Sequence, residues 1–134
     1  MTRQILFICV ENAGRSQMAE GFARAYGLTA SSAGTMPAEK VNPIVVEAMK
    51  ERGIALPAKP KMLTEQMIRQ ADLIVTMGCS VQEVCPRPLV RQMEKKIVDW
   101  HIEDPKGKPI EEVRKIRNQV ESKVMELLKL EQEA

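Results

Sequence analysis

The sequence predicts an α/β fold in which four parallel strands form one sheet with helices on both faces. Short apolar segments alternate along the chain with longer segments whose apolar residues recur every three or four positions, as they do in helices. The first apolar segment, Ile5–Ile8, has no polar alternation, which is typical of a strand buried on both sides. Strands that alternate with helices favour parallel pairing, because each helix carries the chain back to the starting edge of the sheet.

The first strand leads through a short loop into the first helix. Cys9 stands where the strand should end, and residues 10–14 form a loop before Arg15 and Ser16. Apolar residues then repeat at helical spacing: Met18, Ala19, Phe22, Ala23 and Tyr26. Gly27 is suited to end this helix, because glycine readily adopts the left-handed conformation that follows many helices.

The middle of the chain is predicted to supply two more strands and two helices. Thr29–Ala33 forms a second strand of small residues. Asn42 followed by Pro43 is a favourable helix start, with a capping side chain and a proline in the first turn. Thr64 caps a shorter helix, and residues 72–77 form a third buried strand.

The last part of the chain contains a short strand, a polar loop and a long helix. Ile97 and Val98 form the fourth strand, and the loop after it contains Asp104 and Pro105. The final helix carries an apolar stripe made of Ile110, Val113, Ile116, Val120, Val124 and Leu127. In this fold, ligands bind beyond the carboxyl ends of the strands, so we expect Cys9, Cys79 and Asp104 at one edge. The nine methionines are expected to fill the core.

Length, composition and charge narrow the class of protein. A chain of 134 residues is expected to form one domain, residues 1–134, with a substantial core. The net charge of +2 gives no reason to expect a nucleic acid or a membrane surface as partner. The apolar runs are too short for a membrane span or a secretory signal, so we expect a cytoplasmic protein. We also expect a monomer.

Cysteine and histidine content argue against a disulfide framework and against a metal enzyme. Three cysteines in a reducing compartment fit one nucleophile and one redox pair, but they fit three unrelated thiols equally well. The single histidine, His101, has no partners at the spacing of zinc ligands. We therefore expect no tightly bound cofactor.

The junction between the first strand and the first helix suits a tetrahedral oxyanion. Five backbone N–H groups can point inward there as an anion-binding nest, those of Val10, Glu11, Asn12, Ala13 and Gly14. The helix N-terminus adds free donors, and Arg15 offers a planar fork for two anion oxygens. The same donors and the Ser16 hydroxyl would stabilise a Cys9 thiolate aimed at the anion. The alternative, that Cys9 is only a small buried apolar residue, leaves the coincidence of loop, arginine and serine unexplained.

Five stretches are spread along most of the chain: C-V-E-N-A-G-R-S-Q-M-A-E, S-S-A-G, N-P-I-V-V-E-A-M-K-E-R-G-I, A-D-L-I-V-T-M-G-C and D-W-H-I-E-D-P. Together they resemble the arsenate reductases of the low-molecular-weight tyrosine phosphatase family. The C-x-x-N-x-x-R-S loop is specific for the superfamily, and the R-S-Q-M-A-E continuation and the paired cysteines indicate the reductase branch. The resemblance implies a four-stranded sheet of the phosphotyrosine phosphatase I type and reduction of arsenate to arsenite for arsenic detoxification.

The resemblance also implies a role for each candidate residue. Cys9 would attack the arsenic atom, and Asp104 would act as general acid for the departing oxygen. Cys79 would then attack the sulfur of Cys9 and release arsenite, after which Cys85 would attack Cys79. A thioredoxin-like reductant would reduce the final Cys79–Cys85 disulfide. Cys79 stands one position later than in several relatives, which leaves open which of the two cysteines resolves the intermediate.

Two departures from the family pattern concern the anion loop. Glu11 stands where many relatives carry a small residue, and a carboxylate beside an anion is unfavourable unless it points to solvent. Some relatives bind a potassium ion near the loop. Asn12, Glu20 and Ser32 match that site, but the acidic residue expected near position 61 is missing.

Two other functions compete with arsenate reduction. The first is a tyrosine phosphatase on the same scaffold, acting on phosphate esters. Phosphatases of this family usually wall the pocket with aromatic residues, whereas this chain has only 3% aromatics, and Cys79 and Cys85 would have no role. The second is an oxyanion sensor that binds arsenate or phosphate without turnover.

Overall fold

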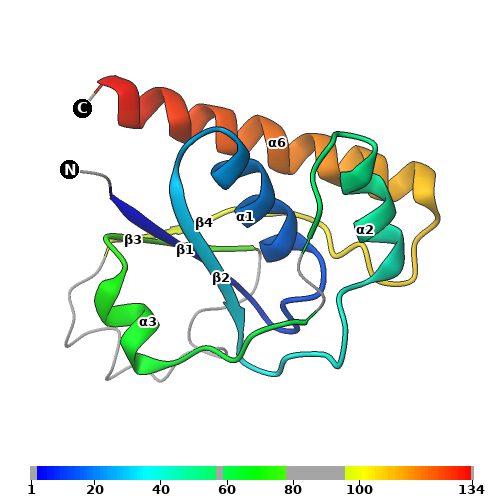
Figure 1. The fold of residues 1–134 in the computed structure, drawn as a ribbon, viewed down its shortest axis with the longest axis horizontal. Helices are drawn as coiled ribbons and strands as arrows, with labels where there is room; N and C mark the ends of the chain where they lie inside the picture. The colour runs from blue at the N-terminus through cyan, green and yellow to red at the C-terminus, as the bar shows by residue number, and fades with distance from the viewer. Residues whose placement is uncertain (1–2, 57–58, 78–95, 134) are drawn as a thin grey trace.

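Four parallel strands form the central sheet, in the spatial order β2-β1-β3-β4 (Figure 1). The computed structural model describes residues 3–56, 59–77 and 96–133 of the chain. The strands are β1 (Gln4–Cys9), β2 (Thr29–Gly34), β3 (Leu73–Thr76) and β4 (Lys96–Asp99). All three pairings between neighbours are parallel, which confirms the predicted α/β fold class.

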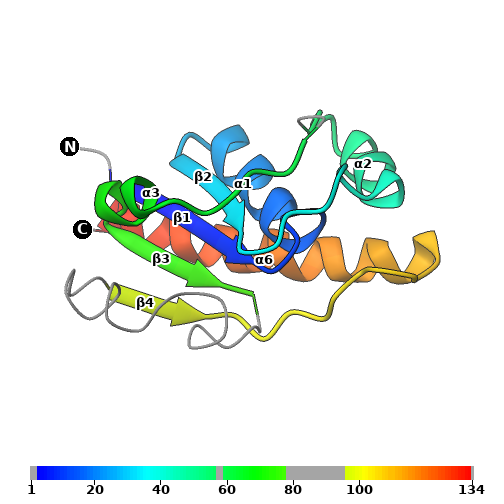
Figure 2. The same ribbon diagram turned by 90° about the horizontal axis from the view of Figure 1, so that it is seen from below.

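Helices cover both faces of the sheet, as expected. On one face lie α1 (Arg15–Ala25), α2 (Pro43–Lys50) and the long α6 (Ile110–Glu133), whereas α3 (Glu65–Gln70) packs on the other (Figures 1 and 2). Each of these elements agrees with the sequence prediction to within a few residues at its ends. In the described part of the chain, no helix combines the length and the apolar character needed to cross a membrane.

Alternation of side chains along β1 divides the core into two clusters. Ile5 and Phe7 face α1, α2 and α6, whereas Leu6 and Ile8 face α3. Successive side chains of a strand point to opposite faces, and here both faces are covered, so every position from Ile5 to Cys9 is buried. Trp100 packs on Phe7 with ring centroids 5.6 Å apart, so it serves the core, as expected.

Local sequence signals set the ends of the helices. The Asn42 side chain accepts the backbone N–H of Ile44 at 3.0 Å and caps α2, and Thr64 caps α3 in the same way. Gly27 and Gly53 follow α1 and α2 with φ angles of 91° and 75°, in the left-handed region where a side chain would be strained. The predicted starts of α2 and α3 and the predicted end of α1 are therefore confirmed.

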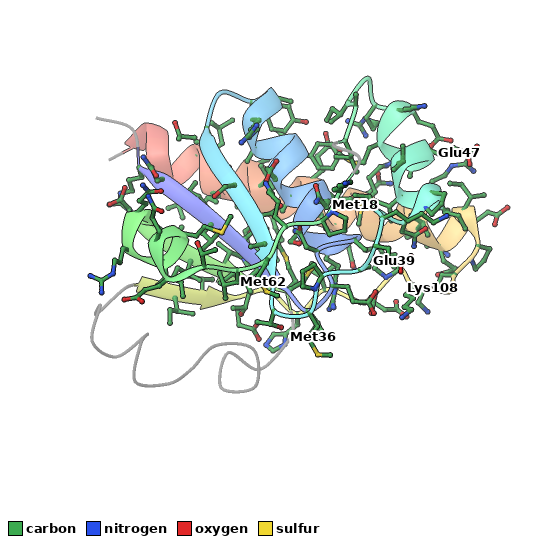
Figure 3. The ribbon with its side chains drawn as sticks, turned by 60° about the horizontal axis from the view of Figure 1, so that its bottom comes forward. Met18, Met36, Glu39, Glu47, Met62 and Lys108 are labelled. Carbon is green, nitrogen blue, oxygen red and sulfur yellow. The ribbon has the colours of Figure 1, made fainter. Side chains whose placement is uncertain are left out.

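The prediction that the methionines fill the core is wrong in part. Met18 and Met49 are buried among the core residues. Met36 and Met62, in contrast, are 72% and 56% exposed near the carboxyl end of β2 (Figure 3). Both belong to segments outside helices and strands, where helical or strand periodicity gives no information about which side chain points inward.

An ion-pair cluster fastens α6 to the end of α2. The Glu51 carboxylate lies 2.7 Å from both Arg114 Nη2 and Arg117 Nη1, and Arg117 also donates to the Ala48 carbonyl at 2.9 Å. The hydrogen bonds from Arg114, and after them those from Arg117, lower the pKa of Glu51 from 4.5 to about 2. Glu51 therefore stays ionised in the folded protein at a pH that protonates an unfolded glutamate.

We expect Glu51→Gln to lower the free energy of unfolding at neutral pH. We also expect this free energy to change less with pH in the variant than in wild type. Because the folded pKa lies below the unfolded value of 4.5, this stabilisation is fully present above that pH and is lost as the pH falls toward 2. Urea unfolding measured across this range checks the prediction. Glu126→Gln is the control, because Glu126 lies 3.9 Å from Lys123 in an exposed pair. If the free energy of unfolding changed with pH in the same way in Glu51→Gln and in wild type, the prediction for Glu51 would be wrong.

Candidate active site

A cavity of about 420 Å³ opens at the carboxyl end of β1. Cys9, Arg15 and Asp104 line it together, although they are far apart in the sequence. Four of the five loop residues also reach it: Val10, Glu11, Ala13 and Gly14. Asn12 and Ser16 are completely buried beside the cavity, and Cys79 and Cys85 lie outside the described residues. The structure thus brings together every predicted site residue that it describes.

The loop between β1 and α1 turns its carbonyl groups away from the cavity. Three of its carbonyl oxygens accept backbone N–H groups from the segment 36–42 at 2.9 or 3.0 Å, those of Val10, Glu11 and Ala13. A trans peptide places its N–H opposite its C=O, so the N–H that follows each of these carbonyls points inward. The N–H of Asn12 lies 3.2 Å from Cys9 Sγ, in agreement with this geometry. The loop has the form of the expected nest.

Two glycines allow other segments to approach this loop closely. A Cβ atom at Gly34 would lie 2.5 Å from the Val10 carbonyl oxygen, so only glycine fits beside the loop. A Cβ atom at Gly14 would lie 2.8 Å from Cγ of Pro105. The Pro105 ring therefore rests directly on the loop, and this contact holds the neighbouring Asp104 at the cavity. Gly34 is the last residue of β2, and no pattern in the sequence marked it for this role.

Asn12 is the centre of the hydrogen bonds behind the loop. Its backbone has a φ of 53°, as expected for an asparagine in a left-handed turn. Its side-chain oxygen accepts the backbone N–H of Lys61 at 2.8 Å and the amide of Gln17 at 2.9 Å. Its side-chain nitrogen therefore donates both hydrogens, to Ser16 Oγ at 2.7 Å and to Ser32 Oγ at 3.0 Å. Neither Gln17 nor Lys61 carried a sequence signal for this role.

Ser16 directs a hydrogen bond at the candidate nucleophile. Its hydroxyl oxygen lies 2.8 Å from Cys9 Sγ. Because this oxygen already accepts the amide hydrogen of Asn12, the hydroxyl hydrogen is available for the sulfur. Cys9 is 3% exposed and receives the Asn12 N–H as well. Two hydrogen-bond donors, the Ser16 hydroxyl and the Asn12 N–H, are therefore aimed at this sulfur.

Arg15 is fixed at the cavity wall by backbone carbonyl groups. Its Nη1 donates to the carbonyl of Met77, at the end of β3, and to that of Ile102 at 3.0 Å. Its Nη2 lies 3.9 Å from Oδ2 of Asp104, and the Arg15 side chain is 12% exposed. These contacts place a permanently charged, planar group at the cavity with little freedom to rotate.

Asp104 and Glu11 lie at the exposed side of the cavity. The Asp104 side chain is 57% exposed, and its Oδ1 accepts the backbone N–H of Lys106 at 3.1 Å in a local turn. The Glu11 carboxylate lies 2.8 Å from Lys106 Nζ. This hydrogen bond raises the pKa of Lys106, which keeps its ammonium charged. The unusual carboxylate of the loop is therefore paired with a cation across the opening.

Asp99, a second carboxylate close to Asp104 in the sequence, lies outside the cavity and has a structural role. It accepts the hydroxyl hydrogen of the buried Thr76 at 2.6 Å and lies 3.5 Å from Nδ1 of His101. The His101 side chain is 89% exposed, as expected for a surface residue. Within residues 3–56, 59–77 and 96–133, no three His, Cys, Asp or Glu side chains form a group that could hold a metal ion.

A parallel sheet with a cysteine at the end of its first strand and an anion loop before the next helix defines the class of phosphatase-like α/β proteins. The sequence model of the family described as low molecular weight phosphotyrosine protein phosphatase matches residues 4–134. The chain therefore belongs to this family.

Relatives of the chain include both reductases and phosphatases. It is 38% identical over 125 residues to the arsenate reductase of Staphylococcus aureus (strain Newman), covering 90% of this chain and 92% of that protein. The structure of the thioredoxin-dependent arsenate reductase of Corynebacterium glutamicum matches with a TM-score of 0.78 and 38% identity, over 98% of this chain and 62% of that one. The YwlE arginine phosphatase of Geobacillus stearothermophilus matches with a TM-score of 0.82 and 27% identity, over 98% and 94%.

We expect Gly34→Ala to weaken phosphate binding by about tenfold, because the added methyl group displaces the loop that carries the N–H donors. Isothermal titration with inorganic phosphate measures this change. Gly21→Ala is the matched control, since its Cβ would meet three side-chain methyl groups at 3.1 Å and no backbone atom of the loop. Equal phosphate affinity in the two variants would show that the close approach of Gly34 does not shape the loop.

Proposed function

We propose that this protein is an arsenate reductase that uses Cys9 as the nucleophile and Cys79 and Cys85 as a disulfide relay. The observation that carries the proposal is the single cavity shared by Cys9, Arg15 and Asp104. Arsenate has the shape and charge of a tetrahedral oxyanion, which suits inward N–H groups and a fixed guanidinium. The family membership and the arsenate reductases among its relatives support the reaction.

The first step forms a covalent bond between the enzyme and arsenic. The Cys9 thiolate, held by the Ser16 hydroxyl and the Asn12 N–H, attacks the arsenic atom and forms a sulfur–arsenic bond. The bond from arsenic to one of its hydroxyl groups breaks, and the protonated Asp104 carboxyl, at the exposed side of the cavity, gives its proton to this hydroxyl so that it leaves as water. Arg15 and the loop N–H groups neutralise the charge of the remaining oxygens.

The next steps reduce arsenic and move the disulfide outward. A Cys79 thiolate attacks Sγ of Cys9, and the electron pair of the sulfur–arsenic bond passes to arsenic, which leaves as arsenite. A Cys9–Cys79 disulfide remains. Cys85 then attacks Cys79, which frees the Cys9 thiolate and leaves a Cys79–Cys85 disulfide. Both relay cysteines lie outside the described residues, so their roles rest on the family resemblance.

An external dithiol must reduce the final disulfide. The thioredoxin dependence of the Corynebacterium glutamicum relative supports a thioredoxin-like partner for this chain. The proposal includes arsenate or phosphate as the bound oxyanion, no tightly bound cofactor and no nucleic-acid partner. It takes the protein to act as a monomer in the cytoplasm.

A phosphatase is the second candidate, favoured by the similarity to the YwlE arginine phosphatase. The same cavity would accept a phosphate ester, with water replacing the second thiol. No aromatic side chain occurs among the described residues that line the cavity, so nothing there stacks on an aryl substrate. The reductase explains Cys79 and Cys85, which a phosphatase does not require.

Arsenate-dependent oxidation of NADPH, with thioredoxin and its reductase supplied, tests the relay. We expect wild type to turn over and Cys9→Ser, Cys79→Ser and Cys85→Ser to stop, because each removes a thiol that the electrons must pass through. Hydrolysis of p-nitrophenyl phosphate is the control. Of the three cysteines, this hydrolysis requires only Cys9, so any such activity should survive in Cys79→Ser. If wild type hydrolyses this ester but never consumes NADPH, the proposal that the protein is a reductase is wrong, and the phosphatase takes its place.

Removal of the general acid gives a separate test. We expect Asp104→Asn to lower the rate of arsenate turnover by about a hundredfold, because the amide cannot protonate the departing oxygen. Asp99→Asn is the matched control, since Asp99 lies outside the cavity and its remaining oxygen can still accept from Thr76. Equal rates in the two variants would remove Asp104 from the mechanism.

A further inference from the structure

A chain of hydrogen bonds runs behind the anion loop from Lys61 to the sulfur of Cys9. Lys61 Nζ lies 2.9 Å from Oε1 of Glu20, and the same oxygen accepts the Ser32 hydroxyl at 2.8 Å. Ser32 accepts from the Asn12 amide, which also donates to Ser16, and Ser16 lies against Cys9. We propose that the Lys61 ammonium is a positioning group that supplies the positive charge of this chain from within the protein, in place of a metal cation.

Glu20 needs a permanent positive partner. Its side chain is only 6% exposed, and both neighbours of Oε1 donate hydrogen bonds to it, so it is bound as a carboxylate. A buried carboxylate is costly unless a cation compensates it. Lys61 is the nearer cation at 2.9 Å, whereas Arg24 Nε lies 3.7 Å from the other oxygen. The Lys61 side chain is itself only 37% exposed, which strengthens the pairing.

The residues around Glu20 do not fit a potassium ion. Asn12, Glu20 and Ser32 match the potassium ligands of relatives in sequence, but Asn12 turns its amide nitrogen, a donor, toward Ser32. Its oxygen accepts from two N–H groups, so turning the amide around would set donors against donors. Alkali cations bind to oxygen lone pairs, as other hard cations do, and the side-chain oxygens of Asn12 and Ser32 are already accepting hydrogen bonds.

The hydrogen bonds of this chain have one direction. With Glu20 ionised, Ser32 must donate to it, and the Asn12 amide then finds acceptors in both Ser32 and Ser16. Ser16 consequently points its own hydrogen at Cys9. If the Lys61 charge is lost, the Glu20 carboxylate stays at the end of this chain without its nearer cation, and its unbalanced negative charge opposes a second negative charge on Cys9. The ammonium of Lys61 therefore helps to hold the thiolate form of Cys9 without touching it.

The backbone of Lys61 is fixed independently of its side chain. Its N–H donates to Asn12 and its carbonyl accepts the N–H of Gly34, both at 2.8 Å. A side-chain substitution leaves these two bonds in place and isolates the effect of the ammonium. The inference rests on the proposed role of Cys9 as nucleophile, but it is independent of arsenate as the substrate.

The pH dependence of Cys9 alkylation by iodoacetamide, followed by mass spectrometry of the Cys9 peptide, tests the proposal. We expect Lys61→Met to move the profile to higher pH and to slow alkylation at neutral pH by about tenfold, because the unbalanced charge of Glu20 disfavours the Cys9 thiolate. Lys61→Arg, which keeps the charge, and Lys59→Met, an exposed lysine of the same loop, should stay within about twofold of wild type. A Lys61→Met profile equal to that of Lys59→Met would overturn the proposal.

A second experiment compares wild type in potassium chloride with wild type in choline chloride at equal ionic strength. Wild type should show the same alkylation profile and the same melting temperature in both salts. A higher melting temperature of wild type in potassium chloride than in choline chloride would indicate a bound potassium ion and overturn the proposal. If Lys61→Met fails to fold, Glu20→Gln, which leaves the Lys61 ammonium unbalanced, should move the alkylation profile to lower pH. A Glu20→Gln profile equal to that of wild type would contradict the proposal, whereas absence of arsenate turnover in wild type would affect only the proposed function.

Discussion

The orientation of the Asn12 side-chain amide is the interaction on which the rest of the site depends. Two N–H groups, from the Lys61 backbone and from Gln17, fix its oxygen, and this leaves both amide hydrogens for Ser16 and Ser32. The left-handed backbone of Asn12 places its N–H on the sulfur of Cys9 at the same time. One buried residue therefore couples the shape of the anion loop to the direction of the donors at the nucleophile.

The sheet provides the rigid frame for this loop. Cys9 pairs with Gly34 and Ile8 with Thr76, so β1 ends between two neighbours that end at the same level. Two close contacts, of Gly34 with the Val10 carbonyl and of Pro105 with Gly14, then hold the loop from two sides. A nucleophile on a strand with buried neighbours on both sides has little freedom to leave its position, which suits chemistry that requires a fixed attack direction.

Sequence patterns predicted the elements and the part of the site that is local in sequence. Cys9, Asn12 and Ser16 fall within eight positions, and the strand–loop–helix pattern was enough to associate them with an anion. The contacts of Lys61, Gly34 and Pro105 arise only when distant segments meet, and no periodicity or spacing encodes such contacts. Asp104 was anticipated because it follows the last strand, and parallel strands end at one edge.

The anchoring of Arg15 links the anion site to the segment that carries the second thiol. One of the two carbonyls that hold its guanidinium belongs to Met77, and Cys79 follows two positions later along the chain. In the proposed relay, Cys79 bonds to Cys9, so the thiol that releases the product is joined through only two peptide bonds to a group that orients the guanidinium. Any shift of the Met77 carbonyl during that step would therefore also change the direction in which Arg15 presents its donors to the oxyanion. Binding of the oxyanion and oxidation of the sulfur thus share one anchoring point.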